Sequence, residues 1–237
     1  MLFKFRGQIP LVFFLLAIPG IYASHFQTIE RLNWLEWTLF SFGVFVSLFG
    51  LIFRFIAVGT SSKHTSGRNT WGQEAKVLNT TGLYSIVRHP LYFANFLIWI
   101  GIVVFVGNPW FLVVFGLLFW LYYERIMYTE EQFLEREFGE EYVEWSNKVP
   151  AFIPKFSNYR GAENTFSLRT ILRREYPGIS AMIISFVFVD FVREWFAACE
   201  PNWKWIHAVW ILIALFYSLV MRTLKHHTSV LNEEDRS

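Results

Sequence analysis

Apolar residues are gathered into long runs along this chain, with short polar segments between them. The clearest run extends from about Leu35 to Val58. Further runs of the same kind lie at about Ile9–Tyr22, Pro90–Gly107, Pro109–Tyr123, Gly178–Phe196 and Trp205–Met221. A helix of about 20 mostly apolar residues is long enough to cross the hydrocarbon core of a bilayer. The pattern therefore predicts an all-α fold, a polytopic membrane bundle of about six transmembrane helices.

The composition also favours a membrane protein. The chain has 237 residues, of which 54% are hydrophobic and 20% aromatic, and it carries 27 Phe and 11 Trp. So many large apolar side chains exceed what one soluble core of this size would bury. The net charge of +2 is too small for a nucleic-acid-binding protein. The single cysteine, Cys199, excludes an internal disulfide and a cysteine-based zinc site, and no metal site is predicted.

The first run allows two interpretations. Lys4 and Arg6 precede it and Ala23-Ser24 follows it, which is the layout of a secretory signal peptide. We favour a retained first span, because further spans follow it and no soluble domain remains to be exported.

Lys and Arg residues near the span ends predict the orientation in the membrane. The loop after the second run carries Lys63, Arg68, Lys76 and Arg88. The segment after the fourth run carries Arg125, Arg136, Lys148, Lys155 and Arg160. Because two spans separate these segments, both lie on one side, and the excess of positive charge makes that side cytoplasmic. Both termini are then cytoplasmic as well.

Two polar segments bracket the hairpin formed by the third and fourth runs, so they meet at one membrane face. The residues that this brings together are Arg88, His89, Tyr92, Glu124, Arg125, Glu130 and Glu131. Ionisable groups at the edge of the hydrocarbon are costly unless they are paired or used, so their grouping indicates a pocket. Taken singly, each has a simpler interpretation: an interfacial anchor for the arginine and histidine, a solvated helix face for the glutamates and an aromatic belt for the tyrosine.

The order of these residues is more specific than any one of them. The chain reads TTGLYSIVRHPLY, then the hairpin, then EEQFLEREFGEEYVEWSNKVPAFIP. This two-part motif resembles the isoprenylcysteine carboxyl methyltransferase family and its prokaryotic relatives, which are small integral membrane methyltransferases. The matching residues are Gly82, Tyr84, Arg88, His89, Pro90, Tyr92, Glu130, Glu131, Leu134, Phe138, Gly139, Tyr142, Val149, Pro150 and Pro154. The resemblance extends over about Gln73–Pro154.

The resemblance implies S-adenosylmethionine as methyl donor, bound in a pocket on the cytoplasmic side, with the acceptor entering from the bilayer. Carried over residue by residue, the cofactor-binding positions are Gln73, Lys76, Val77, Leu78, Asn79, Tyr84, His89, Pro90, Leu91, Tyr92 and Glu130. A carboxylate suits the ribose diol or the amino group of the donor, and tyrosine faces favour its sulfonium cation. Pro90 suits the first turn of a helix, where a backbone N–H has no partner.

The acceptor is expected to be an anionic oxygen, which needs a cation to hold it more than a base. Arginine is the natural choice because its fork binds two oxygens. In the eukaryotic members of the family a substrate-contacting arginine precedes the family glutamate where this chain has Ile126, and Arg125 is its neighbour. We predict Arg88, His89 and Arg125 as catalytic residues. The predicted substrate-binding residues are Arg68, Asn69, Arg88 and Arg125.

The loop SSKHTSGRNT contains donors that suit a phosphate oxyanion, although an ordinary solvated loop is the simpler interpretation. If the loop is functional, the protein is similar in this respect to bacterial relatives that methylate a lipid A phosphate. We therefore expect an integral membrane O-methyltransferase acting on a phosphate or carboxylate of a membrane lipid or lipidated acceptor, in the inner membrane if the protein is bacterial. Two alternatives stay open: an NADPH-dependent sterol-type reductase with a similar Arg-His-Pro-x-Tyr element, and a non-catalytic membrane scaffold of the same fold.

These patterns divide the chain into five parts. Residues 1–58 form the N-terminal transmembrane helices, 59–154 the methyltransferase core, 155–177 a basic linker, 178–222 the C-terminal transmembrane pair and 223–237 a polar, mobile tail. Within the fifth run, the spacing of Asp190 and Arg193 predicts an ion pair on one helix face.

Overall fold

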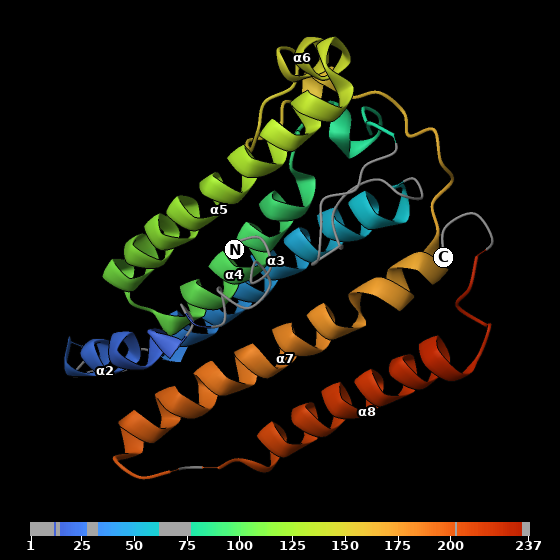
Figure 1. Ribbon diagram of the computed structural model, residues 1–237. Helices are drawn as coiled ribbons and strands as arrows, with labels where there is room; N and C mark the ends of the chain where they lie inside the picture. The colour runs from blue at the N-terminus through green and yellow to red at the C-terminus, as the bar shows by residue number, and fades with distance from the viewer. Residues whose placement is uncertain (1–11, 13–14, 28–32, 62–76, 202, 234–237) are drawn as a thin grey trace.

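A computed structural model describes residues 12, 15–27, 33–61, 77–201 and 203–233 of the chain (Figure 1). All regular elements in these ranges are helices. They are α2 (Ala17–Gln27), α3 (Asn33–Gly59), α4 (Pro90–Val106), α5 (Pro109–Phe138), α6 (Glu140–Ser146), α7 (Leu168–Ala198) and α8 (Trp205–His227), with the short 3-10 helices η2 (Leu83–Ser85) and η3 (Phe156–Asn158).

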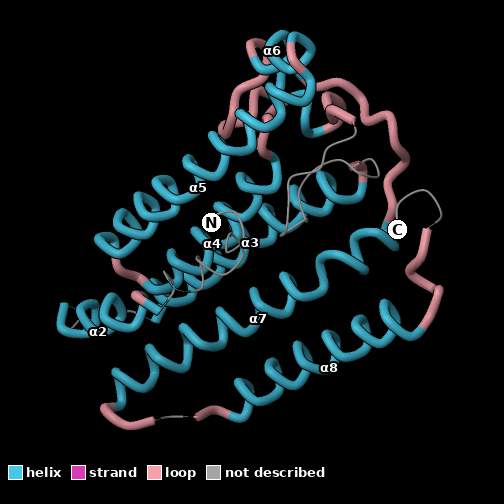
Figure 2. Tube along the Cα trace, in the orientation of Figure 1, coloured by secondary structure: helices cyan, strands magenta, loops and turns pink. Residues whose placement is uncertain are grey.

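The five long helices α3, α4, α5, α7 and α8 run roughly side by side (Figures 1 and 2). Helix α6 lies at one end of this bundle, where α3 ends, α4 and α7 begin and α8 ends. We call this end of the bundle the α6 end. Helix α2 and the turn between α4 and α5 lie at the opposite end.

Length and composition confirm a helical membrane bundle. Three of the described helices are long and apolar enough to cross a membrane, over Trp34–Gly59, Pro109–Phe138 and Trp205–His227, and α4 is a shorter apolar helix. Large apolar side chains such as Trp110 and Phe216 are exposed on these helices, as expected for a surface that faces lipid. The predicted number of six spans stays a prediction, and residues 9–11, 13 and 14 of the first predicted span lie outside the described residues.

Helices α3 and α4 pack closely because glycines face each other across their interface. A Cβ atom added at Gly43 would lie 2.4 Å from the carbonyl oxygen of Gly101, and one added at Gly101 would lie 2.3 Å from that of Gly43. Ser47 on α3 adds a hydrogen bond of 2.8 Å from its hydroxyl to the carbonyl of Ile98. Small residues and short polar contacts of this kind hold membrane helices together. The pair therefore forms a fixed platform for the polar groups at the α6 end.

The hairpin between α4 and α5 follows the prediction. Gly107 adopts a left-handed conformation (φ 78°) after α4, and the Asn108 side chain accepts a hydrogen bond from the Phe111 N–H at 2.9 Å as the N-cap of α5. Pro109 occupies the first turn. Helix α5 then continues without a break beyond the apolar run to Phe138, and Gly139 (φ 55°) separates it from α6.

Two C-terminal features differ from the prediction. Helix α7 begins at Leu168, inside the predicted basic linker, because Ser167 caps it by accepting the Thr170 N–H at 3.0 Å and Pro177 is accommodated within the helix. The predicted mobile tail is packed as far as Glu233, whose carboxylate accepts hydrogen bonds from Ser167 and Thr170. Leu231 is buried beside this contact.

Candidate active site at the α6 end

The start of α4 is fixed by backbone contacts with the segment that follows α6. The N–H groups of Arg88 and His89 donate to the carbonyls of Pro150 and Ala151 at 2.9 and 3.1 Å. Pro90 occupies the first turn of α4 and His89 its N-cap position. Residues distant in sequence are thus brought beside the end of α5, as the sequence motif requires.

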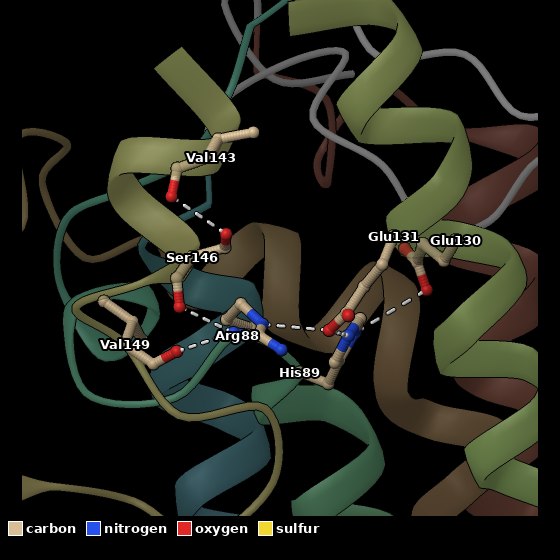
Figure 3. A network of polar contacts seen from close by, with 7 residues as sticks. All are labelled: Arg88, His89, Glu130, Glu131, Val143, Ser146 and Val149. Carbon is tan, nitrogen blue, oxygen red and sulfur yellow. Dashed lines mark hydrogen bonds and ion pairs between the residues drawn. The ribbon is translucent and has the colours of Figure 1, made fainter. Parts of the chain in front are cut away.

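Glu131 on α5 receives two of the motif side chains. Arg88 Nε donates to its Oε1 atom at 2.9 Å, and His89 Nε2 lies 2.9 Å from the same oxygen (Figure 3). The other end of the Arg88 guanidinium is also engaged, because Nη1 donates to the carbonyls of Ser146 and Val149 at 2.7 and 3.0 Å. Arg88 therefore connects α5 to the segment at the end of α6.

Glu130 forms the inner part of the same network. Its side chain is buried, and its Oε2 atom accepts a hydrogen bond of 2.8 Å from the Tyr92 hydroxyl. His89 Nδ1 lies 3.8 Å from that oxygen, so the buried imidazole stands between two carboxylates (Figure 3). The imidazole also stacks on the Tyr92 ring, with 5.5 Å between the centroids. A histidine held in this way has a fixed ring orientation.

Two tyrosines near the carboxylates are kept neutral by their surroundings. Burial raises the pKa of the Tyr84 phenol well above its usual range, and the Glu130 carboxylate adds to the effect, while Arg54 and Arg174 oppose it. Burial also raises the pKa of the Tyr142 phenol, and Glu131 adds to that shift. Both phenols therefore stay protonated to a higher pH than an ordinary tyrosine does.

Two buried donors on α6 have no partner within the described residues. They are the Tyr142 hydroxyl and the Trp145 indole N–H. The Tyr142 ring packs with Leu134, and Leu78 packs against this cluster. Because an unpaired buried donor costs about 1–3 kcal/mol, such groups are expected to have a ligand as partner.

The available groups fit S-adenosylmethionine. That molecule carries a cation, hydroxyl and amino donors, and acceptor atoms on its adenine and carboxylate. The site offers carboxylates for the donors, aromatic faces for the cation and unpaired N–H and O–H groups for the acceptors.

The other predicted cofactor residues are distributed around this network. Pro90 is buried, Leu91 is half-buried and Leu78 lies against the Tyr142 cluster. Val77 is exposed, and the Asn79 side chain accepts a hydrogen bond from the Thr81 N–H. The remaining predicted residues, Arg68, Asn69, Gln73 and Lys76, lie outside the described residues.

The structure does not bring Arg125 into the network. Its side chain is exposed on α5, whereas Ile126, at the position of the family arginine, is buried. The sequence prediction grouped Glu131 with the pocket residues but assigned it no role in the site, and it assigned none to Tyr142 or Trp145 either. The signal was present, because Glu131 is the second residue of the Glu-Glu pair in the motif.

Comparisons with known proteins agree with this placement. The sequence model of the family described as "Phospholipid methyltransferase" matches residues 38–141 of the chain, which include α4, α5 and the residues Arg88, His89, Glu130 and Glu131, whereas Tyr142 and Trp145 lie beyond the match. The relatives include protein-S-isoprenylcysteine O-methyltransferase B of Arabidopsis thaliana, which is 36% identical over 122 residues, or 50% of this chain and 61% of that protein.

Two further relatives show the range of names in the group. The cobalt-zinc-cadmium resistance protein CzcN of Cupriavidus metallidurans is 37% identical over 97 residues, covering 41% of this chain and 44% of that protein. The protein-S-isoprenylcysteine O-methyltransferase of Saccharomyces cerevisiae is 36% identical over 101 residues, covering 40% and 42%. In each case the matched part is less than two thirds of the relative. The shared region is the helical core, and α7 and α8 lie beyond the family match.

Proposed function

We propose, from the similarity of the core of this chain to protein-S-isoprenylcysteine O-methyltransferases, that the protein is an S-adenosylmethionine-dependent O-methyltransferase. Its acceptor is an anionic group, a phosphate or carboxylate, on a membrane-embedded lipid or lipidated molecule. The site faces the cytoplasm, where the excess of Lys and Arg places the α6 end. The observation that carries the proposal is the buried imidazole of His89 between Glu130 and Glu131, together with two buried donors on α6 that have no partner among the described residues.

In this proposal the carboxylates and aromatic residues hold the cofactor. Glu130, oriented by Tyr92, accepts hydrogen bonds from the hydroxyl or amino groups of the cofactor. Tyr84 lies beside Glu130, and its ring together with that of Tyr92 favours the cation. Tyr142 and Trp145 donate to its acceptor atoms.

Arg88 and Glu131 have a positioning role in this scheme. Arg88 holds the Ser146–Val149 segment against α5, and Glu131 fixes both Arg88 and His89. The segment then covers the cofactor and keeps water away from the reacting atoms. A phosphate or carboxylate is already deprotonated at neutral pH, so the transfer needs no base. The role that we assign to His89 is therefore to orient the cofactor.

The bound donor supplies a methyl group on a sulfonium sulfur. Transfer forms an oxygen–carbon bond on the acceptor and breaks the sulfur–carbon bond, so one negative and one positive charge disappear together and no proton moves. The protein therefore contributes in-line placement and exclusion of water, which the rigid α3–α4 platform and the fixed imidazole favour.

Calorimetric titration of detergent-purified protein with S-adenosylmethionine and S-adenosylhomocysteine tests the proposal. We expect saturable binding to the wild type and a loss of about tenfold or more in Glu130→Ala and His89→Ala, because each removes a charge-assisted contact. Glu137→Ala, on the exposed side of α5, is the matched control and should bind like the wild type. A folded, monodisperse wild-type sample that binds neither compound would reject the proposal in favour of NADPH binding or a scaffold role.

A further inference from the structure

A second buried polar network joins α3, α4 and α7 beside the Glu130 site. Arg54 on α3 donates from Nε and Nη2 to the two carboxylate oxygens of Glu175 on α7, the latter contact at 3.2 Å. Its Nη1 atom donates to Asn95 Oδ1 on α4 at 2.7 Å. The Glu175 side chain is 1% exposed and that of Arg54 is 16% exposed. Charged groups at such depth in a membrane bundle usually serve a function.

The two networks meet on α4. Asn95 lies one helical turn after Tyr92, and Tyr92 donates to Glu130. Tyr84 lies in the electrostatic field of Glu130 on one side and of Arg54 and Arg174 on the other. Arg54 lies roughly 8 Å from the last residue of α3, at about 1.5 Å of rise per residue, which is close to the α6 end of the bundle.

Arg54 keeps hydrogen-bonding capacity for a ligand. A guanidinium has five N–H donors, and Arg54 uses three of them, leaving two without a partner in the described part of the chain. Glu175 and Asn95 fix the orientation of the group, so a two-oxygen anion can be bound without a further loss of side-chain freedom.

Two of the arginines that were predicted for this role, Arg88 and Arg125, are less well placed. Arg125 is exposed on another face of α5, and Arg88 is committed to Glu131 and to the α6 segment. Ile126, where the family has its arginine, is buried and carries no charge.

We propose that Arg54, oriented by Glu175 and Asn95, binds the anionic headgroup of the methyl acceptor next to the Glu130 site. The ligand is a lipid that carries a phosphate monoester or a carboxylate. The inference rests on the proposed function, since it identifies the acceptor subsite of that reaction. It also explains product release, because methylation removes one negative charge from the group that Arg54 holds.

Lipid binding to full-length protein in phosphatidylcholine nanodiscs tests this subsite. The probes are phosphatidic acid for the phosphate, N-acetyl-S-farnesylcysteine for the carboxylate and diacylglycerol as the neutral lipid, with bound lipid counted by native mass spectrometry. We expect the wild type to prefer one anionic probe over diacylglycerol by about tenfold or more. Arg54→Gln should lose this preference while its affinity for S-adenosylmethionine stays within about twofold. The control is Arg193→Gln, which changes an ion-paired arginine at the opposite end and should keep the preference for the anionic probe.

Glu175→Gln distinguishes a binding arginine from a merely structural ion pair. Glu175→Gln removes a competing anion but also weakens the orientation of Arg54, so the preference should fall less than in Arg54→Gln. An equal loss in the two variants would overturn the inference. If Arg54→Gln does not fold, Arg54→Lys replaces it, because it keeps the charge without the fork. Unchanged preference in Arg54→Lys, or no preference in the wild type, would also overturn the inference. If the wild type does not bind S-adenosylmethionine, the proposed function itself is rejected, and this inference with it.

Discussion

Both ends of the bundle contain ionisable side chains that are buried or half-buried, but the two ends use them differently. At the opposite end, Arg193 pairs with Glu36 at 3.3 Å and donates to the Phe105 carbonyl at 2.7 Å. His207 Nε2 lies 2.8 Å from Asp190, and its Nδ1 atom accepts the Lys204 N–H at 3.3 Å. Each charged group there has a protein partner that belongs to another helix or to a helix end.

At the α6 end, by contrast, some polar groups of the network have no partner among the described residues. One imidazole stands between Glu130 and Glu131, and the donors of Tyr142 and Trp145 have no partner among the described residues. A network that is satisfied within the protein stabilises the fold, whereas one with surplus donors and acceptors is arranged for a ligand. The comparison therefore separates a structural end from a functional end.

The largest expected effect concerns Glu131. Glu131→Ala releases both Arg88 and His89, and a displacement of about 1 Å at a reacting centre costs about 100-fold in rate. We expect a loss of that size in the transfer of labelled methyl from S-adenosylmethionine to extracted membrane lipids. Asp190→Ala, which removes a carboxylate at the opposite end, should stay within about twofold of the wild type. A Glu131→Ala enzyme that keeps a third of its activity would contradict a positioning role.

The second prediction concerns the opposite end. Arg193→Ala removes a charge-assisted bond to a buried carbonyl, an ion pair and a contact over the Phe105 ring at 4.8 Å. We expect the free energy of unfolding to fall by about 2 kcal/mol, measured by thermal unfolding in detergent, with unchanged methyl transfer at low temperature. Arg136→Ala, on the exposed side of α5, should change neither quantity. If Arg193→Ala abolished activity without loss of stability, the division between the two ends would be wrong.

Local sequence signals predicted the helices that carry the site. Proline in the first turn and glycine at the end marked the bounds of α4, and Pro109 and Gly139 did the same for α5. The Arg-His-Pro and Glu-Glu elements predicted which segments meet. These features are local, so a single sequence is enough to detect them.

Contacts between distant helices were not predictable in this way. Arg54 and Glu175 are 121 positions apart, and no periodicity connects them. The charges around Glu175 and the proline at position 177 indicated a linker, yet capping by Ser167 and packing extend the helix through them. Asp190 and Arg193 were expected to pair with each other, whereas the ion pairs that the structure describes join Asp190 to His207 and Arg193 to Glu36 on other helices.

The third prediction concerns the unpaired hydroxyl of Tyr142. Tyr142→Phe removes a buried donor without a partner in the described structure, so the cofactor-free protein should gain up to about 1 kcal/mol of stability. The same change should weaken S-adenosylmethionine binding about fivefold by calorimetry, because the bound cofactor is the expected partner. A gain in stability together with a loss of cofactor affinity identifies a ligand-binding hydroxyl and not a structural one. Lower stability with unchanged cofactor affinity would assign Tyr142 to the structural group.

The smallest effect is expected at Arg125, where the sequence motif and the placement of the side chain differ. The motif made this residue a candidate for binding the acceptor, but its side chain is exposed on α5. An exposed arginine without a contact in the described part contributes little to a reaction that occurs on the buried side of the helix. Arg125→Ala should therefore change the KM for the lipid acceptor and kcat by less than about twofold, with Arg136→Ala as the matched control. A tenfold rise in KM confined to Arg125→Ala would mean that α5 presents a different face to the acceptor during turnover.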